Sequence, residues 1–127
     1  NLAAKYPDIN FIVTNPTSLS AANIFYTRDI HAGLENDLNQ ISYLSRSCEL
    51  IVGKNSGPFS YCQNRENLMD PDRTFFNFSK LPGDCPSGGR TYKARCLFSN
   101  TTDDVRIFKL IDNVLQYPQL RGTELII

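Results

Sequence analysis

The sequence is poor in the residues that build metal and redox sites. Among its 127 residues there is no tryptophan, and His31 is the only histidine. The four cysteines are Cys48, Cys62, Cys85 and Cys96. No two of them have the Cys-x-x-Cys spacing of a zinc site, and a single histidine cannot complete one. We therefore expect no structural metal. We expect free thiols because the sequence shows no secretion signal.

The sequence also lacks an excess of either charge and any long apolar run. Thirteen basic residues balance thirteen acidic residues, so no overall field attracts nucleic acid or an anionic membrane. No apolar run approaches the roughly 20 residues of a membrane-spanning helix. The first residues do not show the basic and then apolar pattern of a signal peptide. These absences predict a cytoplasmic protein with neither a nucleic-acid partner nor a transmembrane segment.

What the sequence does contain is an alternation of strand-like and helix-like segments. Apolar runs of strand length occupy residues 9–14, 23–27, 50–52, 74–78 and 95–99. Helical patterns cover residues 2–6, 37–47, a segment that begins at 57 or 58, and 103–116. Such alternation is typical of a parallel sheet covered by helices on both faces. We predict an α/β fold over residues 1–127, a single Rossmann-like three-layer sandwich with a mostly parallel sheet.

Local patterns add detail to this fold. In the helix at 37–47, Asp37 is expected to cap the N-terminus and Gln40 to complete a capping box. Thr101 or Thr102 is expected to cap the helix at 103–116. The apolar stripes expected on these two helices are Leu38, Ile41, Leu44 and Cys48 on the first, and Ile107, Phe108, Ile111, Val114 and Leu115 on the second. The strand at 9–14 is apolar at most positions, which predicts burial on both faces.

The strongest candidate site is the turn Asn55-Ser56-Gly57-Pro58, at the carboxyl end of the strand at 50–52. Ligands of open parallel sheets bind at this end of the strands. Gly53 and Gly57 can allow close approach of a ligand, and the first turn of a helix leaves backbone N–H groups that bind phosphate. Ser56 adds a hydroxyl and Asn55 an amide. Ordinary turn chemistry between a strand and a helix explains the same residues equally well.

Weaker candidates lie after other strands and in the glycine-rich loop. Thr14, at the end of the first strand, is expected to line the same crevice, although Asn15-Pro16 is also a plain turn. His31 follows the second strand and can face a ligand, but a lone histidine in a loop is more often exposed to solvent and has no functional role. Near residues 80–93, which are expected to form a surface loop, the residues Arg90, Lys93 and Arg95 form a possible diphosphate clamp, for which surface solvation is the simpler explanation.

The segment from Asp37 to Pro58 resembles a stretch in the C-terminal half of GT-B glycosyltransferases, with the heptosyltransferase-like group most similar. In that group a helix of the type L-x-x-L-x-x-x-A/C leads into a strand and a G-x-D-S-G-P-x-H turn, which here reads Gly53-Lys54-Asn55-Ser56-Gly57-Pro58. The resemblance implies that Ser56, Gly57 and Pro58 lie beside the diphosphate of a nucleotide-sugar donor. It also implies no cofactor, since backbone N–H groups can stabilise the leaving diphosphate without a metal.

The resemblance leaves three functional hypotheses. In the first, the chain is the nucleotide-sugar-binding domain of a glycosyltransferase. It would then be a fragment or half of a two-domain GT-B protein, since a nucleotide-binding half usually opens with a strand rather than a helix. It would also need a second domain or partner chain, because a GT-B active site lies in a cleft between two such domains. In the second, it is a non-catalytic Rossmann-like module for a ligand or partner, since Asn55 and Ser60 replace the aspartate and histidine of the motif. The third is a sugar-nucleotide epimerase on a related scaffold.

Overall fold

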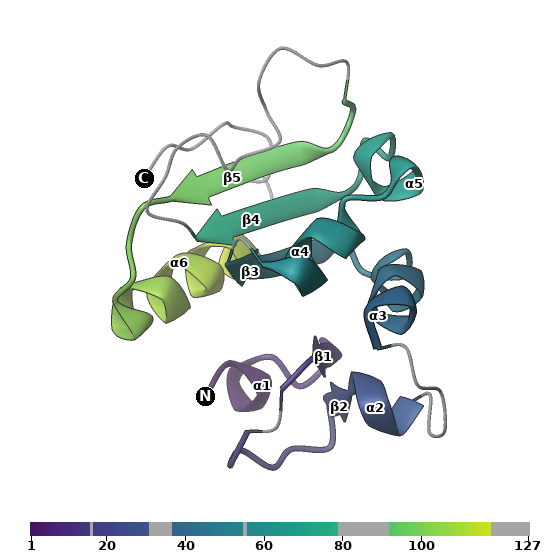
Figure 1. Cartoon of the computed structure of the whole chain (residues 1–127). Coiled ribbons are helices and arrows are strands. Elements are labelled where there is room, and N and C mark those ends of the chain that lie inside the picture. The colour runs from purple at the N-terminus through teal and green to yellow at the C-terminus, as the bar shows by residue number, and fades with distance from the viewer. Residues whose placement is uncertain (16, 31–36, 55, 79–91, 118–127) are drawn as a thin grey trace.

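Strands and helices alternate along most of the chain, as the sequence predicts. The computed structural model describes residues 1–15, 17–30, 37–54, 56–78 and 92–117 (Figure 1). The strands are β1 (Phe11–Val13), β2 (Ile24–Tyr26), β3 (Leu50–Lys54), β4 (Thr74–Phe78) and β5 (Arg95–Ser99). The helices are α1 (Leu2–Lys5), α2 (Thr27–Ile30), α3 (Asp37–Ser45), α4 (Gly57–Cys62), α5 (Arg65–Leu68) and α6 (Asp104–Gln116).

The strands form two parallel sheets rather than the single sheet expected. β1 pairs with β2, and the larger sheet has the order β3-β4-β5. β4 is its central strand, and all five of its residues are buried. Phe75 and Phe76 are both 0% exposed although they point to opposite faces. The larger sheet must therefore be covered on both sides.

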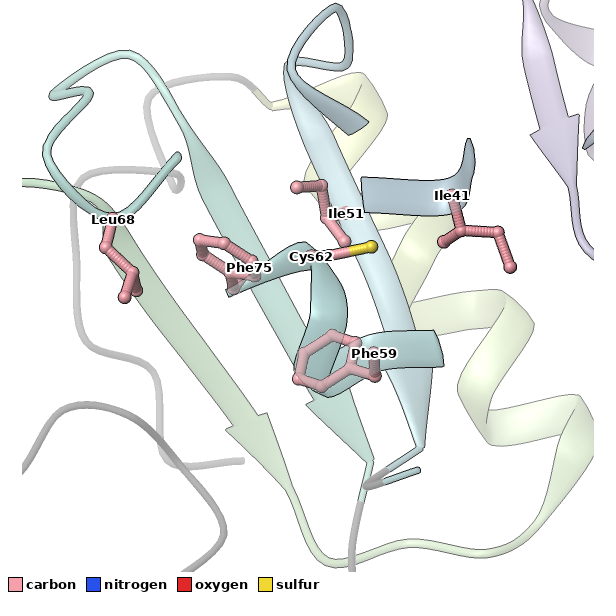
Figure 2. Packing of buried hydrophobic residues seen from close by; sticks show 6 residues of the cluster. All are labelled: Ile41, Ile51, Phe59, Cys62, Leu68 and Phe75. Atoms are coloured by element: carbon pink, nitrogen blue, oxygen red, sulfur yellow. The ribbon is translucent and has the colours of Figure 1, made fainter. Parts of the chain in front are cut away.

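One face of the larger sheet is covered by α3, α4 and α5. Its core cluster consists of Ile41, Ile51, Phe59, Cys62, Leu68 and Phe75 (Figure 2). Phe59 of α4 meets Phe75 of β4 edge-on, with ring centroids 6.0 Å apart and planes at 84°. This arrangement is one of the two that aromatic pairs prefer. The contact holds α4 against the middle of the sheet.

The opposite face is covered by α6. Its cluster consists of Phe76, Phe78, Leu97, Ile107, Leu110 and Val114. The alternation of side chains along β4 sends Phe76 and Phe78 to this side, where their rings lie 4.5 Å apart between centroids. The larger sheet is thus the middle layer of three, as expected for a Rossmann-like α/β fold.

Helix α6 differs from its predicted version in its cap and in its buried face. Asp103, not Thr101 or Thr102, is the N-cap, and its carboxylate accepts a hydrogen bond from the Arg106 N–H at 2.7 Å. Thr101 is buried and accepts instead from the Asp103 N–H. The predicted core residue Phe108 is 56% exposed, and Leu110 is buried. The buried face is therefore rotated relative to the predicted stripe, and α6 packs through positions 107, 110 and 114.

A polar network, not an apolar stripe alone, joins α3 to α5. Asp37 is the first residue of α3 rather than its cap, and Ile41 is buried while the other predicted stripe residues are half-buried. Gln40 and Ser45 are buried on the same helix. The fully buried Asn67 of α5 donates to Ser45 Oγ at 2.7 Å and to the Cys62 carbonyl at 2.8 Å. α5 was not predicted, because its four residues are too few for a periodic pattern.

The smaller sheet is less buried than predicted. Each residue of β1 is half-buried, so the expected burial on both faces is wrong. Asn23, just before β2, donates through its side-chain amide to the carbonyl oxygens of Ala3, Tyr6 and Ile9. These bonds tie α1 and the following turn to the pair of strands. Among the described residues, no helix is long and apolar enough to cross a membrane.

Helix α1 is also fastened to α6 by a small ionic cluster. Lys5 Nζ donates to both carboxylate oxygens of Asp112, at 2.8 and 2.7 Å, and Tyr6 Oη donates to Asp112 Oδ1 at 2.5 Å. The hydrogen bond from Lys5 has the largest effect on Asp112 and lowers its pKa below the ordinary 3.8. The hydrogen bond from Tyr6 lowers this pKa as well. The hydrogen bond to Asp112 raises the pKa of Lys5 and that of Tyr6. This cluster links residues that are far apart in the sequence.

We predict that Asp112→Asn weakens the attachment of α1 and flattens the acid limb of the stability profile. A lowered carboxyl pKa stabilises the fold above pH 3.8, and this contribution is lost as pH falls through the folded pKa. Urea unfolding between pH 2 and 7 measures the slope. The exposed Asp72 of the turn before β4 supplies the control, Asp72→Asn. Equal pH slopes for the original protein and Asp112→Asn would contradict the prediction.

Candidate functional site

The turn between β3 and α4 lies where a ligand site of a parallel sheet is expected. β3 continues to Lys54, two residues further than predicted, so Gly53 lies inside the strand instead of closing it. Since β3, β4 and β5 are parallel, their carboxyl ends meet at one edge of the sheet. Ser56 and Gly57 follow β3 at this edge, and both are exposed. The predicted site residues Asn55 and His31 lie outside the described residues.

The first turn of α4 offers fewer free donors than the sequence suggests. Ser56 is the N-cap, and its Oγ accepts from the Phe59 N–H at 3.4 Å. The Ser60 N–H donates to the Ser56 carbonyl at 2.9 Å, and Pro58 has no N–H. The Gly57 N–H is therefore the one first-turn amide without an acceptor among the described residues. With only six residues, α4 also has a small dipole.

Gly53 serves packing and not the approach of a ligand, which corrects the prediction. A Cβ at this position would lie 2.7 Å from Cδ2 of Phe59, whose ring is buried in the core. Gly57 is different, because a Cβ there would meet only Leu38, at 3.9 Å. Of the two glycines, Gly57 alone presents its backbone to solvent at the turn.

Lys54 is a candidate site residue that was not predicted from the sequence. It is the last residue of β3, exposed, and two residues before the Ser56 cap. Lys54 lies at the same edge of the sheet as Gly57, on the α6 side by the alternation of side chains along β3. Ammonium groups bind phosphate as compact point charges. Its position directly before the turn was the available signal.

The other described turn at this edge, between β5 and α6, is closed on itself. The Thr101 N–H donates to Ser99 Oγ at 3.3 Å, and the Asp103 N–H donates to Thr101 Oγ1 at 3.2 Å. Asp103 and Asp104 then bring two carboxylates to the start of α6. The two carboxylates disfavour an anion at this turn, so the β3–α4 turn is the better candidate of the two described turns at this edge.

The remaining predicted residues are not brought to the β3–α4 turn. Thr14 follows β1 in the smaller sheet and is exposed, and in the described part of the chain no hydrogen bond joins it to Ser56–Pro58. Lys93 and Arg95 lie at the start of β5, and the Lys93 N–H donates to the Leu68 carbonyl. They are thus at the amino end of the strands, away from the β3–α4 turn, and both are exposed, which agrees with the simpler explanation of surface solvation. Arg90 lies outside the described residues.

Acidic and thiol groups do not add a reactive centre to the described structure. The sequence Asp70-Pro71-Asp72 has Asp-x-Asp spacing but precedes β4, at the amino end of the strands, and Asp70 pairs with Arg73 at 3.0 Å. The described residues contain no group of three or more His, Cys, Asp or Glu able to hold a metal ion. Burial raises the pKa of the Cys48 and Cys62 thiols, which makes them poor nucleophiles at neutral pH.

We predict opposite outcomes for alanine at the two glycines of this region. Gly53→Ala forces the buried Phe59 ring to move, and such overpacking costs about 1–3 kcal/mol of unfolding free energy. Gly57→Ala meets only ordinary contact and is expected to change stability by less than about 0.5 kcal/mol. Guanidinium unfolding of both variants measures the difference. Equal stability of Gly53→Ala and the original protein would contradict the assignment of Gly53 to packing.

No family model matches this sequence, and searches of curated proteins and of solved structures likewise find no match.

Proposed function

We propose that this chain is a nucleotide-sugar-binding domain of a glycosyltransferase, with the donor diphosphate at the β3–α4 turn. The observation that carries the proposal is the position of this turn, an exposed serine and glycine at the carboxyl edge of a three-stranded parallel sheet. Open α/β sheets bind their ligands at that edge. The resemblance of residues 37–58 to the GT-B turn supports a nucleotide sugar as the ligand.

The binding groups would be few and complementary. The Gly57 N–H supplies one backbone donor, the Ser56 hydroxyl can donate to a phosphate while it accepts from Phe59, and Lys54 supplies a positive charge. A short helix contributes little dipole, so the charge of Lys54 matters more than it would at a long helix. Exposure of all three residues leaves them open to a ligand.

Catalysis would depend on groups beyond this turn. Lys54, Ser56 and Gly57 are suited to holding an anion, and none of them is a ready general base at neutral pH. A second domain or partner chain would complete the enzyme by supplying the acceptor and the base. The alternative is a non-catalytic module that binds a ligand or partner, which the few free donors of the turn also favour.

We predict that Ser56→Asp abolishes diphosphate binding without unfolding the protein. Aspartate is as good an N-cap as serine, so the helix keeps its cap, but the added charge repels a phosphate. Isothermal titration and thermal shift with UDP, GDP, ADP and CMP measure binding. The matched control is Ser56→Asn, which caps without charge and should bind within about threefold of the original protein. A lack of response to all four nucleotides in the original protein would reject the proposal.

We also predict that Lys54→Ala weakens binding of the preferred nucleotide by about tenfold, the effect of losing one charge-assisted hydrogen bond. The exposed Lys109 of α6 provides the control, Lys109→Ala, which should leave the affinity unchanged. Equal affinities of Lys54→Ala and the original protein would exclude Lys54 from the site. Release of free sugar from the bound donor by this chain alone, followed by chromatography, would show that turnover needs no second domain.

A further inference from the structure

Three of the four cysteines lie in the described part of the chain, and all three reach the core cluster on the α3–α5 face of the larger sheet. Cys62 is a member of that cluster, and Cys48 and Cys96 pack against it. Cys85 lies outside the described residues. The proposed anion site at the β3–α4 turn uses no thiol, so the inference that follows does not depend on the proposed function.

The order of the strands separates Cys96 from Cys62. In the larger sheet, Ile51, Phe75 and Cys96 form one row across β3, β4 and β5, and their side chains point to the same face. Phe75 is 0% exposed and lies in the middle of this row. Figure 2 shows the sulfur of Cys62 directed away from Phe75, on the side of Ile41 and Ile51. Cys62 therefore faces α3, and Cys96 lies on the other side of Phe75.

Hydrogen bonds place the segment of Cys48 beside the end of α4. Cys48 follows the last turn of α3, and its N–H donates to the Ser45 carbonyl at 3.1 Å. Ser45 Oγ accepts from Asn67 Nδ2 at 2.7 Å. The same Nδ2 atom donates to the carbonyl of Cys62, the last residue of α4, at 2.8 Å. One side-chain amide thus bridges the two segments that carry the thiols.

The electrostatic interactions of the two thiols agree with this proximity. Burial has the largest effect on the pKa of Cys62 and raises it, the hydrogen bond with Ser45 lowers it, and the charge of Cys48 raises it further. The last effect requires that the two thiols lie near each other. Burial raises the pKa of Cys48, and the charge of Arg73 lowers it. Cys48 is half-buried and Cys62 is buried, so a reagent in solution reaches Cys48 first.

We propose that Cys48 and Cys62 form a reversible disulfide when the protein meets a low-molecular-weight disulfide such as oxidised glutathione. The Cys48 thiolate attacks one sulfur of oxidised glutathione, which forms a mixed disulfide and releases one glutathione thiolate. The Cys62 thiolate then attacks Cys48 Sγ and displaces the second glutathione thiolate. The two protein thiols together lose two electrons and two protons, and the oxidant takes up both and becomes two molecules of reduced glutathione.

The bond would join the segment after α3 to the last residue of α4. It closes a covalent loop over residues 48–62, which contains β3, the β3–α4 turn and α4. Cys48 lies in neither a helix nor a strand, so its backbone can adjust to disulfide geometry while α4 stays in place. A closed loop restricts the unfolded chain. Oxidation would therefore stabilise α4 against the sheet, and reduction would remove this constraint.

Oxidation of the unmodified protein with excess oxidised glutathione at about pH 8.5, where thiolates are populated, tests the bond. Trypsin cleaves after Arg46, Lys54 and Arg65, so the thiols fall in peptides 47–54 and 55–65. After alkylation of the remaining thiols, mass spectrometry should find these two peptides as one linked species that dithiothreitol separates. The oxidised protein should keep its near-ultraviolet circular dichroism. Its urea midpoint should rise by about 1 M or more, as expected for a closed loop of this length.

A matched pair of variants identifies the two thiols. Cys48→Ser should keep the circular dichroism of the original protein but lose both the linked peptides and the rise of the urea midpoint on oxidation. Cys96→Ser also removes a half-buried thiol of the same cluster, and it should retain both. The proposal is overturned if peptides 47–54 and 55–65 remain separate in the oxidised original protein, or if either is linked mainly to the peptide of Cys85 or Cys96. A link that forms only with loss of the near-ultraviolet signal would also overturn it.

Discussion

The burial of β4 on both faces is the constraint on which the larger sheet depends. Phe75 and Phe76 are fully buried and point in opposite directions, so helices must cover both sides. β3 and β5 satisfy the backbone of β4 through parallel pairing. α6 packs against Phe76 and Phe78, while α4 packs against Phe75 through the ring of Phe59. The three layers follow from the burial of both faces of β4.

The same packing decides what the candidate site can offer. The Phe59 ring fills the space above Gly53 and so fixes where α4 begins. That position puts Ser56 at the carboxyl edge of the sheet, but it also makes Ser56 the acceptor for the Phe59 N–H. Ser56 Oγ therefore caps α4, and this role limits how it can contact a ligand. An anion at this turn would be held by the Gly57 N–H, the remaining donor of Ser56 and the charge of Lys54.

Much of the fold could be predicted from local pattern, and much of the site could not. The bounds of β4 and β5 agree with the expected 74–78 and 95–99, and α4 begins at Gly57 as expected. Phe108 was wrongly placed in the core and Leu110 was missed, because helical periodicity does not specify which side of an apolar stripe packs against the sheet. Lys93 and Arg95 were expected near the glycine-rich loop at 80–93, and their position in the sequence did not show that they lie at the amino end of the strands.

The sequence by itself determined the α/β alternation, the strand at 74–78 and the start of a helix at Gly57, because side-chain period and turn chemistry depend on neighbours within a few residues. Only the tertiary structure decided that the strands form two sheets, that Asn67 is buried in a polar network, and that Asp112 holds α1. Lys5 and Asp112 are separated by 107 positions. No local pattern encodes such a contact, because it arises only when packing of the layers brings the two helices together.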